Sequence, residues 1–193
     1  MVRDVSREVA KCHCFDVKCD MKRISIVGPA GSGKSTLAVK LGEILNLPVY
    51  HIDCYFLKPD WQPTDKQELA KQIAEITKND AWIIEGNYKL TLENRFEKSD
   101  KIIFLNLPFE FCLDSIKQRH HQKEKRVGLP EYLDMTEERL PELIEKISAK
   151  GHYDELHRLV EKYKSKVIEL KNRSEVNDFL CSLKPVNGSD EWS

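Results

Sequence analysis

The chain carries no excess of charge of either sign, since its 193 residues include 31 Lys and Arg against 32 Asp and Glu. It therefore lacks the positive field that gives a protein a general affinity for nucleic acid, and we expect no direct nucleic-acid binding. It also lacks an apolar run near the roughly 18 residues needed to cross a bilayer. Charged residues such as Arg3 and Asp4 stand where a secretory signal would need apolar ones. We expect a cytoplasmic protein without a membrane partner.

The paired Cys-x2-Cys knuckles that ordinary structural zinc sites use are also missing. Six cysteines are present, and three of them, Cys12, Cys14 and Cys19, lie with His13 in the first twenty residues. This cluster is a candidate site for a soft metal, but its spacing favours free thiols. Without a secretory signal, reduced cysteines are expected in place of disulfides.

The length of the chain suits one compact α/β domain with a sizeable core. Residues 1–20 show no clear hydrophobic period, whereas an apolar run begins just after Met21. We expect a flexible N-terminal extension over 1–20, one domain over 21–185 and a C-terminal tail over 186–193. A regulatory segment or the product of an upstream start codon is an equally open interpretation of the extension.

Short apolar runs alternate with amphipathic segments along the domain. The runs predict strands at 22–27, 48–52, 81–84, 101–107 and 166–170. The segments between them predict helices at 35–46, from 63–65 to about 76, at 109–121 and at 175–183. Continuous apolar strands that alternate with helices imply a parallel sheet covered on both faces. Ligands of such sheets bind beyond the carboxyl ends of the strands.

A complete G-x-x-x-x-G-K-[ST] motif stands between the first predicted strand and the first predicted helix. It consists of Gly28, Pro29, Ala30, Gly31, Ser32, Gly33, Lys34 and Ser35. The glycines let backbone N–H groups surround phosphate oxygens, and the helix that follows adds the positive end of its dipole. We expect Lys34 to reach the β- and γ-phosphates, Ser35 to bind magnesium and Thr36 to assist near the α-phosphate. The motif predicts binding of a nucleoside triphosphate with Mg²⁺.

Acidic residues end the two strands that follow this loop. Asp53 comes after the second predicted strand, where a carboxylate can accept or orient the proton of a substrate hydroxyl. Its neighbour His51 either contacts substrate or makes a local hydrogen bond. Glu85 ends the third strand, where an acid can hold magnesium through water, and Gly86 behind it allows a ligand to approach closely.

Three further regions supply candidate binding residues. Residues of about 119–140 form a polar, basic insertion, which suits a lid that brings Arg119 and Arg126 to the transferring phosphoryl group. Arg173 follows the fifth strand, where it can contact the nucleotide base. Asn87, Tyr88 and Arg95 lie in a segment that is a candidate lining for an acceptor pocket, and Tyr88 is equally a candidate core residue.

Together these residues give the chain a resemblance to the small P-loop kinases of the adenylate kinase and shikimate kinase type. The resemblance is closest to the bacterial DNA topology modulation proteins (the FlaR-related group), and it rests on residues 22–36, 47–53, 82–88 and 103–108. It implies a P-loop NTPase fold: a three-layer α/β/α sandwich, a five-stranded parallel sheet in the order 2-3-1-4-5, and a helical lid. Glu85-Gly86 matches the acid-glycine pair of adenylate kinases, and Arg119 falls where their lid arginine begins. Asn87-Tyr88-Lys89 stands where adenylate kinases have Phe-Pro-Arg, which argues against adenylate kinase activity.

Two functions are compatible with these motifs. The first is an ATP-dependent phosphotransferase in which Lys34, Asp53, Glu85, Arg119 and Arg126 act on a nucleotide, a nucleoside or a small hydroxy compound. The second is a nucleotide-dependent regulator or slow NTPase linked to DNA topology modulation. The absence of an N/T-K-x-D guanine-reading motif favours ATP over GTP. The sequence leaves the acceptor and the oligomeric state open.

Overall fold

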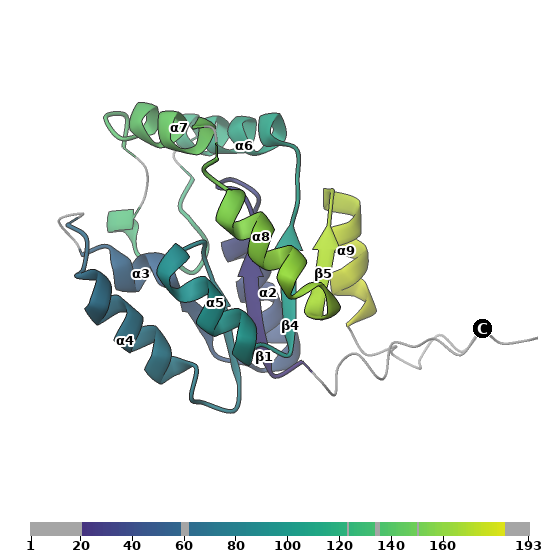
Figure 1. The fold of residues 1–193 in the computed structure, drawn as a ribbon. Helices are drawn as coiled ribbons and strands as arrows, with labels where there is room; N and C mark the ends of the chain where they lie inside the picture. The colour runs from purple at the N-terminus through teal and green to yellow at the C-terminus, as the bar shows by residue number, and fades with distance from the viewer. Residues whose placement is uncertain (1–20, 59–61, 123, 134–135, 150, 184–193) are drawn as a thin grey trace, which may run out of the picture.

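The computed structural model describes residues 21–58, 62–122, 124–133, 136–149 and 151–183. The expected N-terminal extension, its cysteine cluster and the C-terminal tail therefore lie outside the described residues. Figure 1 shows a central sheet with helices on both faces and a helical layer across one end. This arrangement confirms the predicted three-layer α/β/α architecture.

All five strands of the sheet are parallel. They are β1 (Arg23–Val27), β2 (Val49–His51), β3 (Trp82–Glu85), β4 (Lys101–Leu105) and β5 (Val167–Leu170). Their spatial order is β2-β3-β1-β4-β5, which confirms the predicted order. Because the central strands are buried on both faces, they consist of nearly unbroken apolar sequence, such as Ile24 to Val27 in β1.

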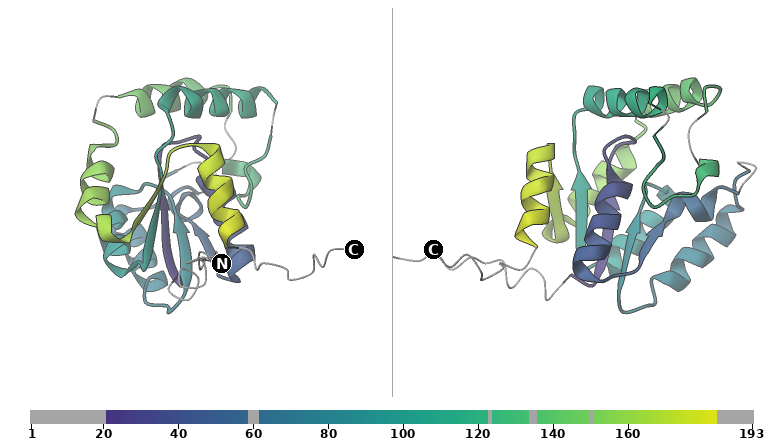
Figure 2. Two further views of the ribbon diagram at one scale, coloured as in Figure 1. Left: turned by 90° about the vertical axis from the view of Figure 1, so that its right-hand side faces the viewer. Right: turned by 180° about the vertical axis from the view of Figure 1, so that it is seen from behind.

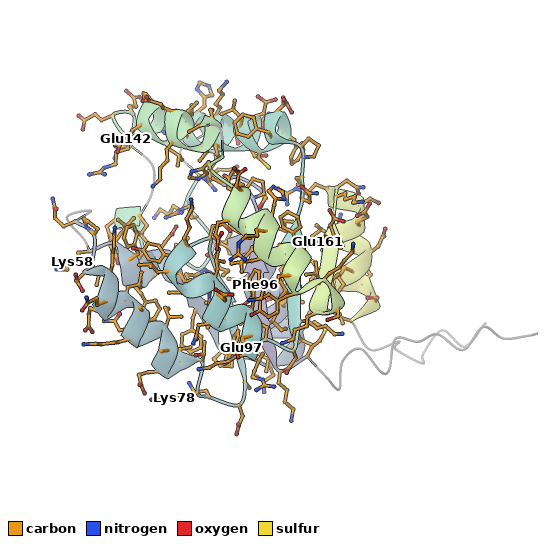
Figure 3. The ribbon with its side chains drawn as sticks, in the orientation of Figure 1. Lys58, Lys78, Phe96, Glu97, Glu142 and Glu161 are labelled. Atoms are coloured by element: carbon orange, nitrogen blue, oxygen red, sulfur yellow. The ribbon has the colours of Figure 1, made fainter. Side chains whose placement is uncertain are left out.

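Helices α2 (Lys34–Leu45) and α9 (Arg173–Ser182) cover one face of the sheet, and α5 (Lys89–Lys98) and α8 (Asp154–Lys162) cover the other. The two faces can be compared in Figure 2. Phe96 of α5, labelled in Figure 3, belongs to the same core cluster as Leu156 and Leu159 of α8 over this second face. Beside β2 and β3, α3 (Ile52–Phe56) and α4 (Lys66–Ile76) bury Ile52, Leu69 and Ile73 against the sheet.

The remaining elements lie between β4 and β5 in the chain. Helices α6 (Phe109–His121) and α7 (Leu140–Ser148) cross above the carboxyl ends of the strands (Figure 1), and a loop with the 3-10 turn Glu131–Leu133 joins them. A second 3-10 turn, Lys164–Lys166, precedes β5. The expected lid at 119–140 corresponds to the end of α6, this loop and the start of α7.

The sequence patterns missed several helices. None of α3, α5, α7 and α8 was predicted, because each is short or predominantly polar. A usable signal existed for α5, since Leu92 and Phe96 are spaced to share one face, and both are buried. The last helix begins at Arg173, earlier than expected, because Asn172 accepts a hydrogen bond from the Glu175 backbone and caps it.

Candidate functional site

The predicted phosphate loop connects β1 to α2 at the carboxyl edge of the sheet. Its backbone has positive φ angles at Gly28 (147°), Gly31 (80°) and Gly33 (89°). A Cβ at Gly31 would lie 2.2 Å from the carbonyl oxygen of Cys112, so both the conformation and the space exclude a side chain there. The loop is thus held tightly against α6, with its glycines where its shape needs them.

Two observations show that the loop suits a phosphate ligand. The Ser32 side chain is buried, and its Oγ finds no partner among the described residues. Lys34 donates a hydrogen bond from Nζ to the Pro29 carbonyl (2.8 Å). This acceptor is neutral, whereas an ammonium group binds an anion more strongly. Burial lowers the pKa of Lys34, against the opposing effect of the Glu85 and Asp53 carboxylates. Phosphate oxygens would satisfy Ser32 and give Lys34 a charged partner.

Glu85 ends β3 beside the loop and is buried. Its Oε1 accepts a hydrogen bond from Ser35 Oγ (3.0 Å) and lies 2.8 Å from His51 Nδ1. Burial raises the pKa of a carboxyl group, but the His51 hydrogen bond and the Lys34 ammonium outweigh it, so the pKa of Glu85 lies below its ordinary value. An ionised Glu85 can only accept, so His51 Nδ1 carries the proton. The structure thus contains the local hydrogen bond that is one of the two roles expected for His51.

The segment after Glu85 fastens the strand to the loop. Asn87 donates from Nδ2 to the Gly28 carbonyl (2.6 Å) and accepts from the Gly28 N–H (3.1 Å). Tyr88 packs against Phe56 with ring centroids 4.6 Å apart.

Arg95 is fully buried and donates to the Gly86 carbonyl (2.8 Å) under the strand end. Desolvation lowers the pKa of Arg95 to about 9 against the effect of Glu85, so it stays charged at neutral pH. The buried cation therefore supports the Glu85-Gly86 turn. The interpretation of Arg95 as an acceptor-pocket residue is wrong, because the side chain is fully buried.

Asp53 lies in α3 and meets the loop that joins α6 to α7. Arg126 donates from Nη1 to Asp53 Oδ2 (3.0 Å) and from Nη2 to the Leu133 carbonyl (2.8 Å). Gly128 of the same loop approaches His51 so closely that a Cβ would lie 2.8 Å from His51 Nε2. The structure thus brings Glu85 of β3 and Arg126 of the α6–α7 loop to His51 and Asp53, which lie close together in the sequence.

Of the other predicted site residues, Arg173 contacts the phosphate loop directly. Arg173, at the start of α9, packs its guanidinium against Gly33 and over the Phe111 ring, 5.4 Å from the ring centroid. Thr36 is exposed in the first turn of α2, and Arg119 is partly buried in the last turn of α6.

Sequence reasoning missed Tyr153, whose hydroxyl accepts a hydrogen bond from the Ala30 N–H of the loop (3.1 Å). No sequence signal marks it, because the two residues are 123 positions apart.

Within the described ranges, no cluster of three or more His, Cys, Asp or Glu residues is arranged to hold a metal ion. Mg²⁺ does not need such a cluster, because it keeps several waters and binds through one or two protein groups plus substrate phosphates. Ser35 and Glu85 fit that pattern. None of the described helices has the length and apolar character to cross a bilayer.

No protein-family model matches the chain. A stretch of 45 residues is 56% identical to a cytidylate kinase of Lawsonia intracellularis (strain PHE/MN1-00), and it represents 23% of this chain and 20% of that protein. The chain thus matches about a fifth of this relative's length. These findings give no support to the DNA topology modulation part of the resemblance.

Among solved structures, the fold is similar to shikimate kinase from Bacteroides thetaiotaomicron, with a TM-score of 0.50 and 15% identity. The match covers 84% of this chain and 96% of that one. A gluconokinase from Sinorhizobium meliloti 1021 matches with a TM-score of 0.49 and 15% identity, over 85% of this chain and 92% of that one. The chain has the fold of the P-loop kinases.

Proposed function

We propose that the protein is an ATP-dependent, magnesium-requiring phosphotransferase that acts on a small molecule. The hydrogen bond from Ser35 to Glu85 at the end of a complete phosphate loop carries the proposal. This bond joins the two groups suited to magnesium, and Ser35 directly follows Lys34 in the chain. A bare glycine-rich turn would need neither the buried acid nor its His51 partner.

In the proposed binding mode, the loop N–H groups and Lys34 hold the phosphates, Ser35 binds the metal, and Glu85 holds it through water. Bound Mg²⁺ would neutralise charge on the phosphates. Thr36 lies near the α-phosphate, and Arg173 contacts the base across Gly33. Arg119 and Arg126 reach the transferring group from the region 119–140, which we propose acts as a lid of the domain at 21–185.

In the proposed reaction with a hydroxyl acceptor, Asp53 accepts the hydroxyl proton as the oxygen of the acceptor attacks the γ-phosphorus. The phosphate oxygen of a nucleotide acceptor would attack without this proton transfer. A new P–O bond forms, the bond to the bridging oxygen of ADP breaks, and ADP leaves with the electron pair. Arg126 donates a hydrogen bond to Asp53 in the structure. Its release from Asp53 would free the base and supply a cation to the phosphoryl group in one movement.

The acceptor is a nucleotide, a nucleoside or a small hydroxy compound. The local identity to a cytidylate kinase makes CMP the first compound to test. The charged pair of Asp53 and Arg126 suits an acceptor that carries both a hydroxyl group and an anionic group, because one binds a proton and the other an anion. We expect the reaction to occur in the cytoplasm, where ATP is present.

Transfer from γ-labelled ATP with Mg²⁺ to a panel of nucleoside monophosphates, nucleosides and hydroxy acids tests the proposal. Lys34→Ala is the matched control, since it removes the ammonium that binds the phosphates. We expect label on one acceptor class, lost in the variant. Tight ATP binding without transfer to any acceptor would contradict the kinase proposal and favour the alternative, a nucleotide-dependent regulator linked to DNA topology modulation.

A further inference from the structure

One peptide group of the phosphate loop, between Pro29 and Ala30, is held from two sides. Its carbonyl accepts a hydrogen bond from Lys34 Nζ at 2.8 Å, and its N–H donates to the Tyr153 hydroxyl at 3.1 Å. Lys34 belongs to the loop itself, whereas Tyr153 belongs to the segment between α7 and α8. The nucleotide mechanism described above uses no group from that segment.

The fold positions Tyr153 firmly. Gly151 turns the chain after α7 with a φ angle of 79°, and Tyr153 then begins α8 by accepting from the His157 N–H (3.0 Å). The Tyr153 ring packs against the core cluster that includes Val27, at the end of β1, and its hydroxyl reaches the phosphate loop. The Tyr153 side chain makes no capping hydrogen bond to α8, so its hydroxyl contacts the phosphate loop and not the helix.

The position of this hydroxyl relates it to the terminal phosphate. The lysine of such a loop reaches the β- and γ-phosphates, and here the Lys34 ammonium lies against the same peptide group that Tyr153 contacts. Tyr153 therefore lies on the side of the loop where the β- and γ-phosphates are expected. Together with Pro29 it also lines a cavity of about 450 Å³, so the space beside the hydroxyl is open.

A phenol hydroxyl accepts and donates at the same time. The Ala30 N–H uses the acceptor side of Tyr153, which leaves the hydroxyl proton for an anionic oxygen. Burial raises the pKa of Tyr153, against the opposing effect of the Ala30 hydrogen bond, so the phenol keeps its proton at neutral pH.

We propose that Tyr153 recognises the terminal phosphoryl group: its hydroxyl donates to a γ-phosphate oxygen while it holds the Ala30 amide. The residue thereby makes the protein prefer a nucleoside triphosphate to the diphosphate product. This inference rests on the proposed nucleotide binding. It assigns the preference for triphosphate over diphosphate to one hydroxyl group, which follows the proposed lid region in the chain.

The variant Tyr153→Phe tests the inference, because it removes the hydroxyl and keeps the ring. Titration calorimetry with Mg²⁺ should show about tenfold weaker binding of a non-hydrolysable ATP analogue, as expected for loss of a hydrogen bond to a charged group. The affinity for ADP should not change. Tyr163→Phe, at the other end of α8 and packed on Phe96, is the matched control and should leave both affinities unchanged.

Equal losses for both nucleotides, or no loss for either, would overturn the inference. A wild-type protein that binds neither nucleotide would instead refute the proposed function itself. A fluorotyrosine at position 153 gives a second measurement that needs no deletion. Its ¹⁹F resonance should shift with the triphosphate analogue and not with ADP, and identical responses to both would also contradict the role.

Discussion

The carboxylate of Glu85 is buried, ionised and shared by Ser35 and His51. Burying a charge is costly unless it is hydrogen-bonded and paired. Here the cost is offset by His51 and by the nearby Lys34 cation, which together keep the pKa of Glu85 low in spite of burial. The protein therefore maintains an anion beside the proposed magnesium position before any ligand arrives.

The variant Glu85→Gln keeps the shape of this side chain and removes its charge. We expect the magnesium concentration for half-maximal phosphate transfer to rise by about 10- to 100-fold, because groups that hold a metal through water contribute about that much. A magnesium titration of the transfer rate measures it. Glu97→Gln, at an exposed position of α5, is the control. An unchanged magnesium dependence in Glu85→Gln would remove Glu85 from the metal site.

The loop between α6 and α7 contacts the site through Arg126, which is held by Asp53 and by the Leu133 carbonyl. We expect Arg126→Ala to lower the rate of transfer by about 10³-fold or more, as for other arginines that stabilise a transferring phosphoryl group. ATP affinity should be retained, because the loop N–H groups and Lys34 remain.

Lys125→Ala is the matched control for that measurement. Lys125 is adjacent in sequence and pairs with the exposed Glu131, so its loss should leave the transfer rate near that of the wild type. Single-turnover kinetics with saturating ATP separates the chemical step from binding. Equal rates for the wild type and Arg126→Ala would exclude Arg126 from catalysis.

The start of β1 is joined to the turn before β4 by Asp100. This carboxylate accepts from the Arg23 N–H (2.8 Å), from Arg23 Nη2 (2.6 Å) and from the Lys22 N–H (3.2 Å). Burial raises the pKa of Asp100, but the Arg23 contacts outweigh it, so the pKa lies below the ordinary 3.8. Its stabilising effect is complete above that value and is lost as the pH falls through the lower folded-state pKa.

Asp100→Asn should therefore lower the free energy of unfolding by about 1–2 kcal/mol at neutral pH, a range that allows for the solvent exposure of Arg23. The difference from the wild type should shrink as the pH falls below about 4. Urea unfolding across this pH range measures it. A difference that stays constant with pH would show that the charge of Asp100 is not the cause.

Local sequence accounts for most of the molecule's framework. Apolar runs such as Ile24 to Val27 mark buried strands. The phosphate loop is recognisable because all of its motif residues lie within eight consecutive positions, 28–35. Contacts between distant segments could not be predicted from local sequence. The pairs Arg126–Asp53 and Tyr153–Ala30 depend on how the α6–α8 region folds back over the sheet, and no local pattern encodes that.

Arg95 shows a second limit of local reading. An arginine shortly after a strand-end acid suggests a ligand contact, yet its helix directs it under the Glu85-Gly86 turn, where it donates to backbone carbonyls. The helical spacing of Leu92 and Phe96 would have predicted α5, and Arg95 would then have been expected beside their buried face.

Strands β4 and β5 are neighbours in the sheet, so the whole of 106–166 leaves and re-enters the framework at adjacent positions. The closure entropy of such a loop grows slowly, by about 0.6 kcal/mol for each doubling in length. The segment that joins α6 to α7 can therefore lengthen, shorten or be exchanged at little cost to the sheet, provided that α6 keeps its packing on the phosphate loop and α8 its packing on the sheet. New acceptor specificities can arise in this region while the phosphate loop stays unchanged.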